Sequence, residues 1–221
     1  ARTESGVWAA AKRVYRFLSN DRFTHPELGD GLYDISRASV QAEAPSYAVV
    51  ALDPVNFEKP YTHELEGVST VYKSTPPQLN GQARLTSGYP AITAAVVNTR
   101  VPAVTYANWF SYTTDFVSEN LEIKQAITAT RTLLPDYRLR FVTDAGLDDQ
   151  KLFAALADDE FVIRASHLER IVDVYNERLE RWEQESLQDL VDVVWFTHTF
   201  HVSFTHARKT RFATIKVGWF P

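Results

Sequence analysis

Apolar side chains follow helical spacing in some parts of the chain and strand spacing in others. In residues 1–44 they recur at helical spacing, which predicts a helical N-terminal segment. The spacing changes at Tyr47–Leu52, a nearly continuous apolar run typical of a buried central strand. We expect Asp53-Pro54 to end that strand, because proline cannot donate to a sheet ladder. Further strands are expected over Val68–Lys73, Ala91–Asn98, Val101–Phe110, Arg138–Thr143 and Phe161–Ala165, and helices over Asn120–Leu134 and Leu147–Ala157.

The order of these elements predicts the fold class. One strand, a three-stranded meander, and then helices alternating with strands indicate an α/β fold with a mixed sheet and an antiparallel flank. We assign this core to residues 45–166. Within it, Trp109, Phe110 and Tyr112 are expected to pack beneath the meander. The segment 74–87 contains Pro-Pro and Asn-Gly and predicts a loop.

The last part of the chain has a different composition. Leu168–Leu190 carries many charged residues and predicts a solvated helix. Val191–Phe220 is dominated by β-branched and aromatic residues and predicts two or three antiparallel strands. We therefore expect a β-rich subdomain over residues 167–221.

Composition narrows the classes of function. The chain has 23 basic and 28 acidic residues and a net charge of −5, so a nucleic-acid site requires local clustering of positive charge. Cysteine is absent, which excludes disulfides, zinc–thiolate sites and a cysteine nucleophile. No apolar run is long enough to span a membrane. Methionine is absent even at position 1, which predicts that the sequence is a segment of a longer protein.

Two aspartates follow predicted strands. Asp53 comes after one apolar run and Asp144 after another. If the two strands are neighbours, both carboxylates lie at one edge of the sheet, where α/β proteins present functional groups. Paired carboxylates suit Mg²⁺ or Mn²⁺, and two such ions about 4 Å apart promote phosphodiester cleavage. The alternative is that both are turn-forming residues without a metal.

Several stretches together resemble a known family. VVALDPVNFEKPYTHELEGVS contains Asp53, LRFVTDAGLDDQKLF contains Asp144, and FVIRASH follows as the next strand. The two aspartates are 91 positions apart. In this order and spacing, the stretches resemble the catalytic core of DDE transposases of the cut-and-paste, bacterial insertion-sequence type. The ordered set carries the resemblance, since no single motif is specific.

The resemblance implies a ribonuclease-H-like fold with two metal ions, Mg²⁺ or Mn²⁺, held by Asp53 and Asp144. It implies strand cleavage and strand transfer on double-stranded DNA, at transposon ends and target, by a homodimer or higher assembly. A cytoplasmic, nucleoid-associated location in bacteria is also implied. In this family a β-rich insertion precedes a catalytic glutamate on a later helix. We therefore expect the third carboxylate beyond Pro221, and a chain that is incompetent as it stands.

Two alternatives remain open at this point. Glu180 lies 36 positions after Asp144, inside the predicted charged helix, which is the separation found in related integrases that lack the insertion. Glu180 is the minority candidate for the third acid. If it has that role, the protein is a different ribonuclease-H-like nuclease. The other alternative is a non-catalytic DNA-binding transposase remnant or regulator.

Candidates for DNA contact are basic or histidine residues near these elements. By the resemblance, Arg164 and His167 follow a core strand whose arginine touches DNA in the family. Residues 193–221 contain no acid, so a basic strand pair there is suited to a phosphate backbone or, alternatively, to protecting a strand edge. The remaining candidates are Lys59 and Lys73, which flank the loop after Asp53, and Arg208, Lys209 and Arg211 in the predicted strand pair.

Overall fold

The structure is a computed structural model that describes residues 8–10, 12–13, 16, 25–61, 64–73, 84–114, 116–176, 178–194, 197–206 and 209–217. The chain divides into two compact units, Ala1–Arg164 and Ala165–Pro221, and each is described by itself. Much of the predicted first helix, most of the predicted loop 74–87, and Arg208 lie outside the described residues. Among the described helices, none is long and apolar enough to cross a membrane.

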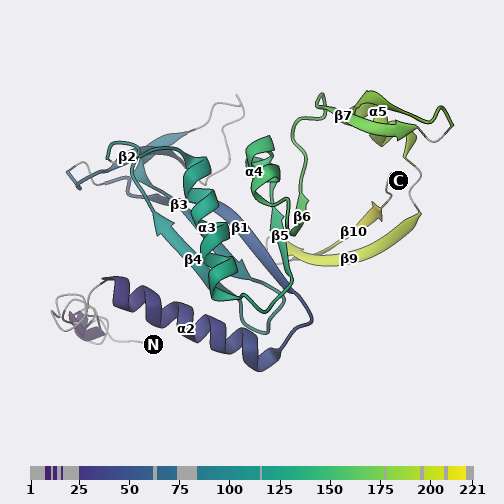
Figure 1. Ribbon diagram of the computed structural model, residues 1–221. Coiled ribbons are helices and arrows are strands. Elements are labelled where there is room, and N and C mark those ends of the chain that lie inside the picture. The colour runs from purple at the N-terminus through teal and green to yellow at the C-terminus, as the bar shows by residue number, and fades with distance from the viewer. Residues whose placement is uncertain are drawn as a thin grey trace. The chain divides into compact units, whose positions relative to one another are not determined.

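A six-stranded mixed sheet is the centre of the first unit (Figure 1). Its strands are β1 (Ala48–Glu58), β2 (Ser69–Tyr72), β3 (Leu85–Val96), β4 (Ala103–Trp109), β5 (Leu139–Thr143) and β6 (Glu160–Ile163). The order is β2-β3-β1-β5-β6, and β4 also pairs with β3. Strand β1 is antiparallel to β3 and parallel to β5, and β5 is parallel to β6. The predicted mixed α/β sheet is therefore confirmed.

Strand β1 is longer than predicted. We expected it to end at Asp53-Pro54, but it continues to Glu58. Its pairing with β5 ends at Ala51, whereas its pairing with β3 runs on to Glu58. Beyond Ala51, β1 therefore pairs with β3 on one side and no longer with β5 on the other. A strand with one paired side is an edge strand at this position, and edge strands tolerate proline.

The core lies on one face of this sheet. Along β1, the side chains of Ala48, Val50 and Leu52 are buried, and the same alternation continues on β5. Helix α3 (Glu119–Leu133) packs against β3 and β4 and buries Ile123, Ala126 and Ile127. Ser118 caps α3 by accepting a hydrogen bond from the Leu121 N–H. Two shorter elements follow β5: the 3-10 turn η1 (Ala145–Leu147) and helix α4 (Gln150–Ala155).

Helix α2 (His25–Glu43) runs along strand β4. The hydroxyl of Tyr33 accepts a hydrogen bond from the Ala107 N–H (3.2 Å) and donates one to the Ala107 carbonyl (3.4 Å). At the other end of α2, the Glu43 carboxylate accepts from the Arg100 N–H. The helix is thus fixed to the sheet by hydrogen bonds to backbone groups.

The second unit contains two hairpins and a short helix: β7 (Ile171–Asn176), β8 (Arg181–Ser186), α5 (Leu187–Val193), β9 (His198–His206) and β10 (Lys209–Val217). The strands predicted near the end of the chain are present as β9 and β10. The helix predicted over Leu168–Leu190 is wrong, because residues 171–186 form the β7–β8 hairpin. Burial alternates along β7 with the two-residue period of a strand. Asn176 turns the chain by accepting from the Arg178 and Leu179 N–H groups.

Candidate active site

The register of the sheet brings Asp53 and Asp144 together. Strands β1 and β5 are parallel neighbours, and Ala51 pairs with Val142, which lies 91 positions later. Asp144 lies the same 91 positions after Asp53, so the two aspartates are level with each other at the carboxyl end of this strand pair. The predicted juxtaposition is thus present, although only Asp144 lies just past the end of its strand.

Both aspartates lie on the sheet face opposite the core. Leu52 and Thr143, which precede them, are buried in the core, and side chains of successive residues point to opposite faces of a strand. Asp53 and Asp144 are exposed. We call this second face, which carries Val49, Ala51 and Asp53 on β1 and Val142 and Asp144 around the end of β5, the acid face.

The pKa of Asp53 is affected by the charge of Asp144, as expected for two carboxylates that lie near each other. The pKa of Asp53 is raised above its ordinary value, first by partial burial and then by the negative charge of Asp144. Burial and a nearby like charge both disfavour the ionised form. At neutral pH the pair therefore carries a repulsion that a cation between the carboxylates relieves.

Local hydrogen bonds hold this pair in place. Asp144 caps η1, and its Oδ1 accepts from the Gly146 N–H at 2.8 Å. The Thr93 hydroxyl donates to the Asp53 carbonyl at 3.2 Å, across the β1–β3 ladder. The carboxylate of Asp144 is thus oriented by a tight turn, while Asp53 is fixed by a strand in the middle of the sheet.

The chemistry of the pair suits a hard divalent cation, since Mg²⁺ and Mn²⁺ prefer carboxylate oxygens. Within the part of the chain that the structure describes, there is no cluster of three or more His, Asp or Glu side chains that could hold a metal. Among the described residues, the acid pair therefore has no third carboxylate or histidine grouped with it as a metal ligand.

The structure gives Glu180 different surroundings from those expected. It lies in the turn between β7 and β8, with a positive φ of 51°, rather than on a helix. Its expected place on a charged core helix is therefore wrong, because the segment around it forms a hairpin. Glu180 also belongs to the second unit, whereas Asp53 and Asp144 belong to the first.

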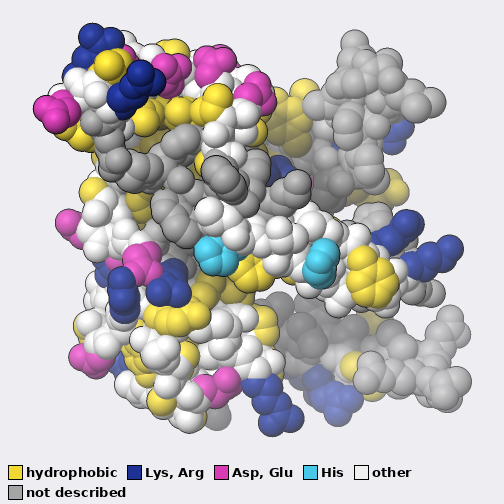
Figure 2. Space-filling model, turned by 90° about the vertical axis from the view of Figure 1, so that its right-hand side faces the viewer, with side chains coloured by type: hydrophobic (Ala, Val, Ile, Leu, Met, Phe, Trp, Pro, Cys, Tyr) yellow, Lys and Arg dark blue, Asp and Glu magenta, His cyan; other side chains and the backbone are white. Residues whose placement is uncertain are grey.

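The candidate DNA-contacting residues are distributed over both units. In the first unit, the Lys59 N–H donates to Ser87 at the end of β1, the Lys73 N–H donates to Arg84, and Arg164 follows β6. In the second unit, the exposed His167 pairs with Glu169 through Nδ1 at 2.9 Å, and Lys209 and Arg211 are exposed on β10. Figure 2 shows histidine, lysine and arginine side chains on the surface that it presents. Arg208 lies outside the described residues.

Two of the three aromatic residues expected in the core are placed differently. Trp109 is 68% exposed and Tyr112 is 41% exposed, while Phe110 packs against the rim of the core. The register of β3 and β4 shifts between Ala94 and Ala95, and such a bulge reverses which side chains face the core. As a result, Trp109 lies on the acid face. Every second residue of a strand lies on the same face, so Phe57, four residues after Asp53, also lies on the acid face. Phe57 was missed from the sequence because the strand was expected to end at Asp53-Pro54.

A pH-dependent gain in stability is expected when Asp144 is replaced by asparagine. Because the pKa of Asp53 is raised on folding, the folded state loses stability as pH rises from the ordinary to the raised value. Asp144→Asn removes the repelling charge while keeping an oxygen that can cap η1. Like charges on neighbouring strands cost about 0.2–1 kcal/mol. Since 1 kcal/mol corresponds to about 2–4 °C at this size, Tm at pH 7 without divalent ions should rise by up to about 4 °C.

The measurement is a thermal melt at pH 3.5 and at pH 7, which lie below and above the ordinary carboxyl pKa values of about 3.9–4.3. The gain should shrink at the lower pH, where protonation neutralises Asp53. A lower Tm at pH 7 would contradict repulsion between the two carboxylates.

No protein-family model matches this chain, and no curated protein sequence matches it. Among solved structures, the chain is similar to one described as the Mos1 transposase paired-end complex with left transposon end, at 10% sequence identity and a TM-score of 0.31. The match covers 70% of this chain and 49% of that chain, so this chain spans about half of its length. The mixed sheet with flanking helices is compatible with a ribonuclease-H-like fold.

Proposed function

We propose that this chain carries part of the catalytic core of a DDE-type DNA transposase with a ribonuclease-H-like fold. The observation that supports the proposal most strongly is the acid pair. Two carboxylates from neighbouring parallel strands are level with each other, and the pKa of Asp53 is raised, first by partial burial and then by the charge of Asp144. Shifted pKa values of this kind are concentrated at functional sites.

In the proposed reaction, Asp53 and Asp144 would hold Mg²⁺ or Mn²⁺ next to the phosphodiester. Such ions, when bound, would lower the pKa of the attacking hydroxyl and stabilise the leaving oxygen. A water molecule attacks first and frees a 3′-hydroxyl, which then attacks target DNA. The protein needs no nucleophile of its own, which agrees with the absence of cysteine. The third carboxylate is not assigned to a described residue.

We propose double-stranded DNA as the partner, at transposon ends and at the target, with the protein acting as a dimer or higher assembly. Positive side chains of both units would contact phosphates, which position DNA without reading its sequence. The proposed contacts are Lys59, Lys73 and Arg164 in the first unit and His167, Arg208, Lys209 and Arg211 in the second.

Binding of Mn²⁺ to the acid pair tests this proposal directly. The expected result is a rise in Tm of the 221-residue chain on adding Mn²⁺. At about 100 times the dissociation constant, an ion that binds only the folded state stabilises it by about 2.7 kcal/mol. At about 2–4 °C per kcal/mol, this raises Tm by about 5–11 °C. Asp53→Asn and Asp144→Asn should each remove most of the shift.

Asp149→Asn is the matched control for this measurement. Asp149 is a nearby exposed aspartate that caps α4 by accepting from the Lys151 N–H at 2.6 Å, and asparagine caps equally well. Its Mn²⁺ shift should equal that of the unchanged protein. Equal shifts in all four proteins would refute the metal site. DNA binding without any Mn²⁺ effect would favour the non-catalytic alternative.

A further inference from the structure

The acid face continues past the aspartates as a group of aromatic rings. Along β1, Asp53, Val55 and Phe57 lie on this face, since they are two residues apart. Tyr89 of β3 lies opposite Phe57, and Trp109 of β4 lies opposite Ala91, the partner of Val55. We call Phe57, Tyr89 and Trp109 the aromatic cluster.

The rings of the aromatic cluster are held in place yet accessible. Phe57 and Trp109 meet edge to face, with ring centroids 5.4 Å apart and planes at 86°. The Tyr89 hydroxyl donates to the Glu66 carbonyl at 2.6 Å, which fixes its ring. Trp109 is nevertheless 68% exposed, and Phe57 is 42% exposed. The β-bulge between Ala94 and Ala95 turns this indole away from the core.

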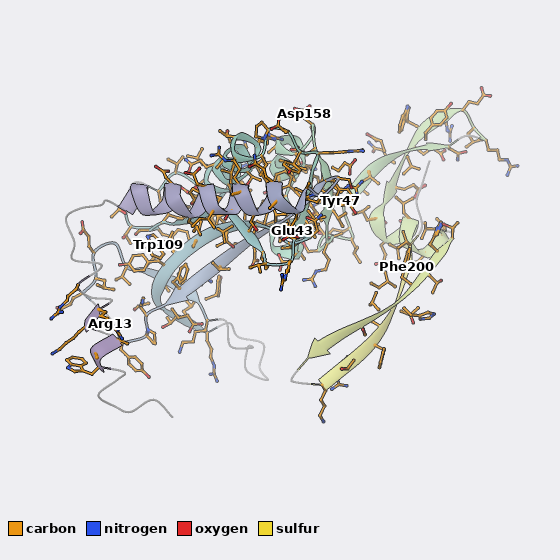
Figure 3. All side chains as sticks on the ribbon, turned by 90° about the horizontal axis from the view of Figure 1, so that it is seen from below. Arg13, Glu43, Tyr47, Trp109, Asp158 and Phe200 are labelled. Atoms are coloured by element: carbon orange, nitrogen blue, oxygen red, sulfur yellow. The ribbon has the colours of Figure 1, made fainter. Side chains whose placement is uncertain are left out.

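A cavity of about 380 Å³ is lined by the aromatic cluster and Lys59. Lys59 is the one charged residue among these four, so the cavity combines aromatic surface with a single positive charge. A larger cavity of about 660 Å³ shares Phe57 and Trp109 and is bounded by Gly29, Asp30 and Tyr33 of α2. Figure 3 shows Trp109 near one end of α2, with Glu43 at the other end. Both volumes fall in the range of about 300–1,000 Å³ typical of ligand pockets.

The position of the cavity relates it to the acid pair. Phe57 is four residues beyond Asp53 on β1, which is about 13 Å at a rise of about 3.3 Å per residue. DNA advances about 3.4 Å per base along each strand, so this distance corresponds to about four stacked bases. A DNA strand with a phosphate at the acid pair therefore reaches the cavity within a few nucleotides.

We propose that this cavity binds an unpaired nucleobase of the DNA substrate, an inference that rests on the proposed function. Nucleobases stack on exposed aromatic side chains whatever their sequence, and a nearby positive charge attracts the phosphate of the same nucleotide. Trp109 provides the stacking surface, Phe57 packs edge to face against it, Tyr89 lines the cavity beside them, and Lys59 faces the phosphate. A base still paired within a duplex cannot enter, so the cavity selects unpaired nucleotides.

Trp109→Leu tests the proposal in the full chain. The probe is a fluorescein-labelled oligodeoxythymidylate of about ten nucleotides, within the site sizes of about 4–16 nucleotides known for single-strand binding. Loss of one stacked base costs about 1–3 kcal/mol, so the affinity measured by anisotropy should fall about 5- to 150-fold. Trp109→Phe keeps an aromatic face and should lose less, and Lys59→Gln should weaken the salt dependence of binding.

Trp182→Leu is the matched control. Trp182 of β8 is also 68% exposed and meets Tyr175 with ring centroids 5.4 Å apart, but it belongs to the second unit, whereas the acid face belongs to the first. Its replacement should leave the affinity unchanged. An abasic oligonucleotide of the same length should bind Trp109→Leu and the unchanged protein equally, because it has no base to stack.

The outcomes separate this inference from the proposed function. If Trp109→Leu binds the oligonucleotide as well as the unchanged protein does, or if neither binds it, the inference is overturned, even where Mn²⁺ still binds the acid pair. If binding depends on Trp109 but Mn²⁺ stabilises Asp53→Asn as strongly as the unchanged protein, the proposed function fails and the base-binding cavity stands. An equal loss with the abasic probe would show that Trp109 does not act by stacking.

Discussion

Asp53→Asn and Asp144→Asn are each expected to abolish divalent-ion-dependent cleavage of supercoiled DNA by the full-length parent protein, since the 221-residue chain by itself is expected to be incompetent. Each change removes a charged oxygen of a proposed metal ligand while keeping the size of the side chain. Metal ions contribute several kcal/mol to such reactions, so the cleavage rate should fall at least about 100- to 1,000-fold. DNA affinity, measured separately by anisotropy, should change little, because phosphate contacts come from positive side chains.

Asp149→Asn again provides the control, since it changes an exposed aspartate only five positions from Asp144. Its cleavage rate should match that of the unchanged protein. An equal loss in all three variants would point to a general effect of negative charge near η1. Unfolding of both Asp53→Asn and Asp144→Asn, seen by circular dichroism, would assign the two acids to structure instead of catalysis.

Gly88→Ala is expected to destabilise the first unit strongly. Gly88 lies in β3 between β1 and β2, where it pairs with Glu58 and with Ser69. An added Cβ would lie 2.4 Å from the Phe57 carbonyl oxygen and 2.6 Å from Val71 Cγ2. Backbone cannot move aside as a flexible side chain can, so overpacking of about 1–3 kcal/mol or more is expected. Tm should fall by about 2–12 °C in a thermal melt.

Gly31→Ala is the matched control and should have the opposite effect. Gly31 lies in α2, and an added Cβ there meets nothing within 4 Å. Alanine restricts the unfolded chain and favours helix by about 0.5–1 kcal/mol, which raises Tm by about 1–4 °C. Equal effects of both substitutions would show that the close approach at Gly88 does not limit stability.

The sequence predicts best what depends on local pattern. The apolar run at Tyr47–Leu52 identified the central strand, and the aspartate after each of two strands identified the acid pair. The length of β1 was not predictable in this way. Proline lacks an N–H, and it interrupts strand pairing only where a neighbouring strand would accept a hydrogen bond at that position. Whether such a neighbour exists depends on where β5 ends, 91 positions away in the chain.

Two other errors also have non-local causes. Trp109 was expected to pack in the core beneath the meander, yet a bulge in the β3–β4 pairing places it on the acid face. The charged segment around Glu180 has acids and bases at helical spacing, but along β7 exposed and half-buried side chains alternate with the period of a strand. In both cases the decisive contact lies on another strand, where a count along one segment cannot find it.

The phenol of Tyr33 has a consequence for the behaviour of the protein in solution. It occupies both hydrogen-bonding groups of Ala107 on β4, so one side chain of α2 takes the place that an incoming strand would need at that residue. Unpaired edge strands can pair with strands of other chains and so lead to fibrous aggregates. Because α2 covers part of the edge of β4, we expect this edge to be less available for pairing with another chain.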